Sequence, residues 1–295
     1  MTGTPWHRRL RDCDLKVGKT IRKRQDLRKA ITGSVGPMSP STENRPLNIV
    51  VWNENVHETR GDATVIGHYP DGMHTVIAEA LRQLQPGADV STATLQEPDH
   101  GITAERLATT DVLFWWGHAA HDEVSDAVVD LVVDAVHAGM GLVVLHSGHY
   151  SKPFKRLMGT TCSLKWRNDG ERELVWTVAP EHPIAAGVPH PIVIDRQEMY
   201  GEYFDIPHPD EEVFLSTFAG GEVFRSGVAY RRGLGKVFYF SPGDQEYPVY
   251  HHPDIQRVLS NAAAWAAPVS ERRELTADPH PRDWFLTDDG GRQAG

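Results

Sequence analysis

The sequence predicts an α/β fold with a three-layer parallel sheet, as in flavodoxin-like and Rossmann-like domains. Two observations support this prediction. Short runs of consecutive apolar residues, such as residues 47–52 and 112–116, alternate along the chain with amphipathic segments of helical length. Apolar runs without polar alternation are typical of strands that are covered on both faces. Strands that alternate with helices in this way indicate a parallel sheet with helices on both sides.

The first half of the predicted domain contains four strands, at residues 47–52, 88–95, 111–117 and 141–145. A helix is expected between the first two, with Asp71 as its N-cap and Pro86-Gly87 as its end. Its apolar stripe consists of Met73, Val76, Ile77, Ala80, Leu81 and Leu84. A second helix is expected from Asp122 to Gly139. Its buried face consists of Val124, Ala127, Val128, Leu131 and Ala135.

The pattern changes from Glu173, where short strands follow one another with turns between them. These strands are expected at residues 174–178, 192–194, 213–217, 227–231 and 236–240. They predict a β-rich extension of the same sheet. A last helix begins at Pro253, a residue that suits the first turn of a helix. Its buried positions are Ile255, Val258, Leu259, Ala262 and Ala266.

Charge divides the chain into a basic leader, residues 1–46, and an acidic body. The leader has 11 basic and 4 acidic residues, which leaves 19 basic and 36 acidic residues for the rest of the chain. A leader of this kind is most often solvated and poorly ordered, and a linker-like run after Met38 suggests that position as an alternative start. The α/β domain is then expected over residues 47–267, and a polar tail over residues 268–295.

Composition also limits the location and the partners of the protein. The acidic body argues against a nucleic-acid partner, because phosphate contacts need clustered Lys and Arg. No apolar run reaches the ~20 residues that span a bilayer, so no membrane partner is expected, and no secretory signal is present. Cys13 and Cys162 give no disulfide framework, which suits a cytoplasmic protein. A homo-oligomer stays open, since nothing fixes the number of subunits.

Polar residues follow four of the predicted strands at the point where each strand ends. They are Asn53 and Glu54, His118 and His121, His146 and His149, and Asp244 in the last loop. Ligands of open α/β sheets bind outside the carboxyl ends of the strands, so these residues predict a functional site. The alternative is that the histidines cap helices or bond to buried backbone groups.

Three kinds of chemistry fit residues of these types. Nucleophilic catalysis is disfavoured, because both cysteines are misplaced and Ser147 lacks the Gly-x-Ser-x-Gly context. Two His-x-x-His pairs suggest a divalent metal such as zinc, with His118, His146 and His149 as ligands. Glu54 or Asp244 would complete a set of nitrogen and oxygen ligands. General acid–base catalysis by His146, His118 and Glu54 without a metal is equally compatible with the sequence. No nucleotide cofactor is expected, because both glycine-rich phosphate motifs are missing.

Other segments suggest a small polar ligand such as a sugar. Tyr69 and His74 flank the start of the first long helix, Glu202 lies in a stretch rich in acids and aromatics, and Arg225 lies between glycines. Aromatic faces stack on sugar rings, and charged groups pair with hydroxyls. Structural salt bridges and turns are the alternative explanation for this region.

Several longer motifs resemble the ThuA-like (trehalose utilisation) family between about residues 47 and 266. They are VWNE at 51–54, YPDGMH at 69–74, WWGHAAHD at 115–122, LHSGHYSKPF at 145–154, GTTCSLKWR at 159–167, EMYGE at 198–202 and GEVFRSG at 221–227. The resemblance implies a fold of the class I glutamine amidotransferase-like type. It also implies a role in carbohydrate metabolism, with trehalose, related disaccharides or their keto derivatives as substrates.

Two comparisons with these families refine the expected chemistry. A gap-free alignment with an amidotransferase elbow places His146 at the nucleophilic cysteine and His149 at the motif's own histidine, which excludes thiol-dependent glutamine hydrolysis. The family pattern Pro-Gly-His-Glu-Thr-Tyr-Pro in the last loop corresponds here to Pro242-Gly-Asp-Gln-Glu-Tyr-Pro248. Asp244-Gln245 therefore replaces a His-Glu pair, which is compatible with a different substrate or with lost activity.

The sequence thus leads to two hypotheses. The first is an enzyme that acts on a disaccharide or keto-sugar by acid–base or metal-assisted chemistry. Its expected catalytic residues are His146, Glu54, His118 and Asp244. Its expected substrate-binding residues are Asn53, Tyr69, His74, His149, Glu202 and Arg225. The second hypothesis is a non-catalytic sugar-binding or scaffold module on the same fold.

Overall fold

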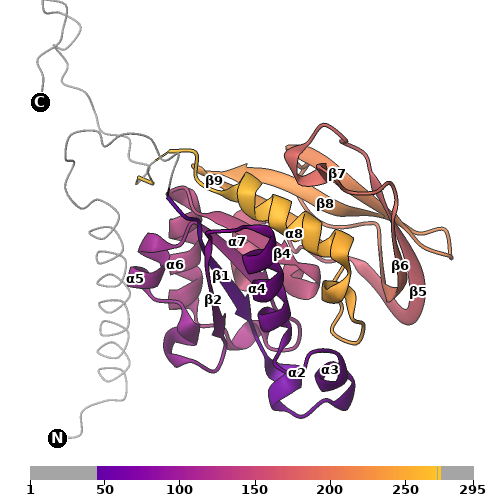
Figure 1. Ribbon diagram of the computed structural model, residues 1–295, viewed down its shortest axis with the longest axis horizontal. Helices are drawn as coiled ribbons and strands as arrows, with labels where there is room; N and C mark the ends of the chain where they lie inside the picture. The colour runs from indigo at the N-terminus through magenta and orange to yellow at the C-terminus, as the bar shows by residue number, and fades with distance from the viewer. Residues whose placement is uncertain (1–44, 271, 274–295) are drawn as a thin grey trace, which may run out of the picture.

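The computed structural model describes residues 45–270 and 272–273 (Figure 1). Nearly all of the predicted basic leader, the alternative start at Met38 and most of the predicted tail therefore lie outside the described residues. The regular elements of the described part begin with a strand at Asn48 and end with a helix at Ala266.

The described part of the chain contains a nine-stranded mixed sheet with the order β2-β1-β3-β4-β9-β8-β7-β5-β6. Its first five strands are parallel to one another. They are β1 (Asn48–Asn53), β2 (Asp89–Thr94), β3 (Val112–Trp116), β4 (Gly141–Leu145) and β9 (Gly235–Phe240). Every residue of β3 and β4 is buried, as their uninterrupted apolar sequences predict. The α/β class is confirmed, and the parallel part is compatible with a flavodoxin-like or Rossmann-like fold.

The remaining strands form an antiparallel extension that joins the parallel part through β8 and β9. They are β5 (Lys165–Thr177), β6 (Ile192–Gly201), β7 (Glu211–Thr217) and β8 (Val223–Arg232). The predicted β-rich extension is therefore confirmed, which makes the whole sheet mixed and not purely parallel. β5 and β6 are much longer than predicted. The polar first half of β5 has no apolar alternation, and it is a strand because its backbone pairs with the end of β6.

Helices cover both faces of the parallel part and give the three layers that the sequence predicts (Figure 1). α4 (Met73–Leu84) and α8 (Pro253–Ala266) lie on one face. α5 (Ala104–Thr109), α6 (Asp126–His137) and α7 (Lys152–Met158) lie on the other. The shorter elements are α2 (Val56–Thr59), α3 (Ala63–His68) and the 3₁₀ turns η2 (Pro98–Gly101), η3 (His121–Glu123), η4 (His146–Tyr150), η5 (Pro183–Ala185) and η6 (Val249–His251).

Two predicted helix starts were wrong. α6 begins at Asp126 and not at residue 122, because the Ser125 hydroxyl accepts a hydrogen bond from the backbone N–H of Val128 and caps the helix there. Val124 lies before the helix but is buried all the same. α4 has Gly72 as its N-cap, while the carbonyl of Asp71 accepts a bond from the Thr75 hydroxyl.

We predict that Gly141→Ala destabilises the fold, because β4 begins against the last turn of α8. A Cβ atom at residue 141 would lie 2.5 Å from the carbonyl oxygen of Ala266 and 2.8 Å from its Cβ. Backbone cannot yield easily, so we expect a loss of about 2 kcal/mol in the free energy of unfolding. Gly67→Ala, in the exposed helix α3 with no atom within 4 Å of the new Cβ, is the matched control and should be neutral or slightly stabilising. Denaturant unfolding of both variants tests this, and equal stabilities would contradict it.

Candidate functional site

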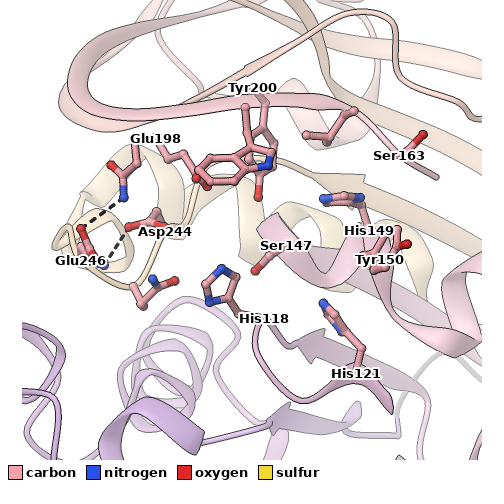
Figure 2. A pocket seen from close by; sticks show the side chains of 14 residues that line it. His118, His121, Ser147, His149, Tyr150, Ser163, Glu198, Tyr200, Asp244 and Glu246 are labelled. Atoms are coloured by element: carbon pink, nitrogen blue, oxygen red, sulfur yellow. Dashed lines mark hydrogen bonds between the residues drawn. The ribbon is translucent and has the colours of Figure 1, made fainter. Parts of the chain in front are cut away.

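A cavity of about 420 Å³ lies where the loops after β3, β4 and β9 meet the antiparallel extension (Figure 2). The loops contribute three of the histidines predicted at the strand ends, His118, His121 and His149, and the predicted Asp244. The extension contributes residues from the start of β5 and the end of β6. The full lining is His118, His121, Ser147, His149, Tyr150, Ser163, Leu164, Trp166, Asn168, Glu198, Tyr200, Asp244, Gln245 and Glu246. The site therefore combines the predicted strand ends with a part of the chain that the sequence did not assign to it.

His146 is not part of the cavity lining, but it contacts three residues that are, Glu198, Tyr200 and Asp244. It lies in the sharp turn from β4 into η4. Its backbone has φ of +47°, a left-handed conformation that is uncommon for any residue except glycine. Its side chain is fully buried, and its Nδ1–H donates to the carbonyl of Ser241 at 2.7 Å. This bond fixes the ring so that Nε2 faces the neighbouring acidic side chains.

Three oxygen atoms surround the Nε2 atom of His146. Glu198 Oε2 lies 3.1 Å away, the hydroxyl of Tyr200 also 3.1 Å away, and Asp244 Oδ2 3.4 Å away. Burial opposes a charge on the ring, but the hydrogen bonds with Asp244 and Glu198 raise the pKa of His146 to about 10. For Asp244, burial acts in the opposite sense, but the bond and the charge of His146 hold its pKa below the ordinary value. Without other ligands, the centre is thus an imidazolium between carboxylates.

The other histidines of the cavity are neutral at physiological pH. Burial lowers the pKa of His149 to about 3 and that of His121 to about 4, and it lowers the pKa of His118 as well. His149 Nδ1–H donates to the carbonyl of Cys162 at 2.6 Å, which leaves Nε2 as the acceptor nitrogen of the neutral ring. His118 Nδ1 shares a hydrogen bond of 2.9 Å with Nε2 of His57. The site therefore holds one charged imidazole beside uncharged ones that can accept a proton.

Glu54 does not line the cavity, and its predicted part in proton transfer stays a prediction. Its buried carboxylate accepts hydrogen bonds from the backbone N–H groups of Ala119 at 2.6 Å and Ala120 at 3.0 Å. These bonds hold the loop that carries His118. Glu54 is therefore a positioning residue of this site.

Two predicted sugar-binding residues near α2 and α4 also lie outside the cavity lining. The Nδ2 atom of Asn53 lies 3.0 Å from Glu58 Oε1 and 3.1 Å from His74 Nδ1, so these polar groups bind one another. Tyr69 is a third case, since its buried hydroxyl donates to the carbonyl of Tyr247 at 2.7 Å. These side chains fix the loops around the site, because their polar atoms are already paired.

Glu202 and Arg225 form a two-fold salt bridge with N–O distances of 2.8 and 2.9 Å. Arg225 also donates to the carbonyl of Phe204 at 2.7 Å. The pair joins the end of β6 to β8, and Glu202 borders a separate open groove beside Trp166. Of the six predicted substrate-binding residues, only His149 lines the 420 Å³ cavity.

Sequence reasoning overlooked Glu198, Tyr200 and Trp166. Glu198 and Tyr200 are two residues apart on β6 and point to the same side of the strand. Their segment looked like a loop, because acids and aromatics obscure the strand pattern. Residues 198, 200 and 202 are each two positions apart, so alternation alone does not show which of them contribute to the site.

The three predicted zinc ligands, His118, His146 and His149, do not form one group in the described part of the chain. Within residues 45–270 and 272–273, the side chains whose ligand atoms all lie within 4.8 Å of one another are His146, Glu198 and Asp244. His118 and His149 are not part of this group. The histidine spacing in the sequence did not show which rings converge.

A sequence model of the ThuA family, described as trehalose utilisation, matches residues 48–266. The chain belongs to the ThuA family. It resembles a ThuA-like protein from Parabacteroides merdae ATCC 43184 with a TM-score of 0.54 and 13% identity, covering 81% of this chain and 94% of that one. A ThuA-like protein from Bacteroides uniformis ATCC 8492 gives 0.51 and 16%, covering 78% and 95%. These identities show a shared fold alone. No curated protein matches the sequence significantly.

This ThuA family member also contains a buried acid, Glu173 on β5, that the cavity does not use. One of its carboxylate oxygens accepts a bond from the Ser216 hydroxyl, and the other has no hydrogen-bond partner. Burial raises the pKa of Glu173 from 4.5 to about 7. Because the folded state holds this proton longer than the unfolded state, its contribution to stability falls as the pH rises from 4.5 to 7.

We predict that Glu173→Gln gains stability relative to the unmodified protein across this pH window. The relative gain between pH 4.5 and 7.5 should reach roughly 3 kcal/mol, because each pKa unit corresponds to 1.36 kcal/mol. Urea unfolding at a series of pH values measures it. Glu79→Gln, an exposed change on α4, should follow the unmodified protein throughout. If the free energies of unfolding of Glu173→Gln and the unmodified protein change with pH in the same way, Glu173 is ionised in the folded state.

Proposed function

We propose that the protein is an enzyme of carbohydrate metabolism that acts on a disaccharide or a keto-sugar in the 420 Å³ cavity. The observation that carries this proposal is the buried ring of His146, whose Nε2 lies within 3.4 Å of both Glu198 and Asp244 beside a cavity lined by further histidines. Structural residues seldom need such an arrangement, and pKa shifts of opposite sign in one cavity are typical of acid–base sites. Membership of a family described as trehalose utilisation supports the substrate class.

The lining of the cavity favours a ligand with many hydroxyl groups. The hydroxyl of Ser147 and the side-chain amide oxygen of Gln245 are buried without a hydrogen-bond partner. Such atoms are usually satisfied, so they favour a polar ligand that supplies the missing bonds. At the rim, the side chain of Trp166 is 67% exposed and that of Tyr150 is 46% exposed. Exposed aromatic faces beside polar groups suit the C–H face of a sugar ring.

The proposed chemistry is proton transfer from a carbon next to a substrate carbonyl, as in a keto-sugar. The neutral imidazole of His118 takes the proton, and the electron pair moves towards the carbonyl oxygen of the substrate. The positive charge held at His146 and the neutral Tyr200 hydroxyl stabilise the negative charge that develops there. The carboxylates of Glu198 and Asp244 keep the imidazole charged during this step.

The turn at His146 supports an amidotransferase-like type of fold for this domain. A residue with positive φ directly after a buried parallel strand is the arrangement of a nucleophile elbow. Here the elbow residue is an imidazole, and the thiol of Cys162 is buried with its pKa raised to about 11. We therefore propose that glutamine hydrolysis through a thiolate is not the activity of this protein.

The partner we propose is a small sugar in the cytoplasm. The acidic body disfavours nucleic acid, and the described residues include no helix that is long and apolar enough to cross a membrane. A non-catalytic sugar-binding module is the second candidate, because Asp244-Gln245 stands where the family pattern has His-Glu.

We predict that Glu198→Gln lowers kcat/KM at least 100-fold on the substrate identified from a panel of trehalose, other disaccharides and their keto derivatives. The neutral amide cannot hold the imidazolium charge, and loss of such stabilisation typically costs 10²–10³ in rate. Glu79→Gln is the control, since α4 contributes no residue to the cavity lining. Product formation by mass spectrometry is the measurement. Saturable sugar binding without any product from the unmodified protein would favour the binding module.

We predict that Trp166→Ala weakens sugar binding about tenfold, because stacking of this kind contributes about 1 kcal/mol or more. Tyr203→Ala removes another aromatic side chain, 69% exposed but absent from the cavity lining, and should leave the affinity unchanged. Calorimetric titration with the sugar measures both. Equal affinities for the two variants would place the sugar away from the rim at Trp166.

A further inference from the structure

The ligand atoms of His146, Glu198 and Asp244 all lie within 4.8 Å of one another, and Glu198 and Asp244 line the cavity. Nε2 of His146 lies 3.1 Å from Glu198 Oε2 and 3.4 Å from Asp244 Oδ2. Nitrogen and oxygen ligands at about 2.0–2.2 Å from a four-coordinate ion are roughly 3.3–3.6 Å apart, so both separations are close to those of a coordination shell. All three side chains are buried.

One hydrogen on Nε2 of His146 cannot bond to all the oxygen atoms around it. The Nε2 atom carries one hydrogen, yet it faces Glu198, Asp244 and the Tyr200 hydroxyl within 3.4 Å. In the part of the chain that the structure describes, the cationic group that contacts the two carboxylates is His146. One imidazolium leaves a buried negative charge uncompensated, which is costly away from water. A divalent cation bound to the neutral ring would balance both carboxylates.

The surroundings orient these ligand atoms as they do in known metal sites. The second ring nitrogen of His146 donates to the carbonyl of Ser241, the usual outer contact of a metal-bound histidine. Asp244 Oδ1 accepts the backbone N–H of Glu246 at 2.8 Å, which leaves Oδ2 for an ion. The side-chain amide oxygen of Gln197, Oε1, accepts hydrogen bonds from the backbone N–H groups of Glu198 at 3.0 Å and Asp244 at 3.3 Å. It therefore links the two segments that carry the acids.

A separate observation points to a missing ligand. The hydroxyl of Ser147 is buried and has no hydrogen-bond partner, although Ser147 lines the same cavity as Glu198 and Asp244. Figure 2 shows this hydroxyl directed into the cavity, between His118 and Tyr200. A water or sugar oxygen bound to an ion at Glu198 and Asp244 would be within the space that this hydroxyl faces.

We propose that His146, Glu198 and Asp244 bind a divalent cation of the Zn²⁺ or Mn²⁺ class, with its open positions towards the cavity. One nitrogen and two carboxylate oxygens suit both ions, and three protein ligands with open positions are typical of catalytic metal sites. This inference deepens the proposed function and rests on it for its substrate. The ion would bind a carbonyl oxygen or neighbouring hydroxyls of the sugar and supply the positive charge that His146 otherwise carries.

The test is calorimetric titration of the full chain, prepared without a histidine tag and stripped with a chelator, with ZnCl₂ and MnCl₂ and no sugar. We expect one equivalent to bind with a micromolar or lower Kd, and to raise the melting temperature. Glu198→Gln and Asp244→Asn should each weaken binding at least 30-fold. Glu246→Gln, a carboxylate of the same cavity outside the ligand group, should bind the ion as the unmodified protein does.

Circular dichroism and thermal unfolding without metal show that each variant is folded before it is compared. No binding by the unmodified protein, or equal binding by all three variants, would overturn the metal site. Sugar turnover that persists in the chelated protein would overturn the proposed part of the ion in the chemistry, while the acid–base function stands. Specific metal binding without turnover of any sugar in the panel would leave the site intact and remove the proposed function.

Discussion

His146 contacts acidic side chains from two segments that are far apart in the sheet. Asp244 follows β9, which pairs with β4, whereas Glu198 belongs to β6 at the far edge of the sheet. A contact of 3.1 Å between β6 and the end of β4 requires the antiparallel extension to curve back towards the carboxyl ends of the parallel strands. The cavity exists because of this curvature, since its lining comes from both parts.

The same contact explains why the histidines of one small cavity differ so widely. Burial disfavours the charged form of every imidazole, and His149 and His121 follow this rule. His146 is buried even more completely but has two carboxylates within 3.4 Å. Those interactions outweigh the loss of hydration. A positive centre next to neutral bases results from the placement of two acids, and not from any property of the histidine motifs themselves.

Several polar side chains at the strand ends hold the frame of the site. Glu54 binds two backbone N–H groups of the loop that carries His118. Tyr69 binds the loop after β9, and the pair of Glu202 and Arg225 fastens the end of β6 to β8. Buried polar groups need partners, and loops need bonds that fix them, so one set of residues meets both requirements. The family motifs therefore include residues that hold the loops of the site in position, and not only residues that would contact a substrate.

The sequence by itself determined the α/β class, the parallel strands, the helices on both faces and the strand ends at which the site lies. These features depend on local periodicity and on the apolar runs of β3 and β4, which are visible in any short window. Only the tertiary structure decided which polar residues meet. The predicted metal set of His118, His146 and His149 followed from spacing along the chain, but ring orientation depends on partners such as the carbonyls of Ser241 and Cys162. Glu198 joins the site because β6 curves back across the sheet, a long-range contact that leaves no periodic signal in its own segment.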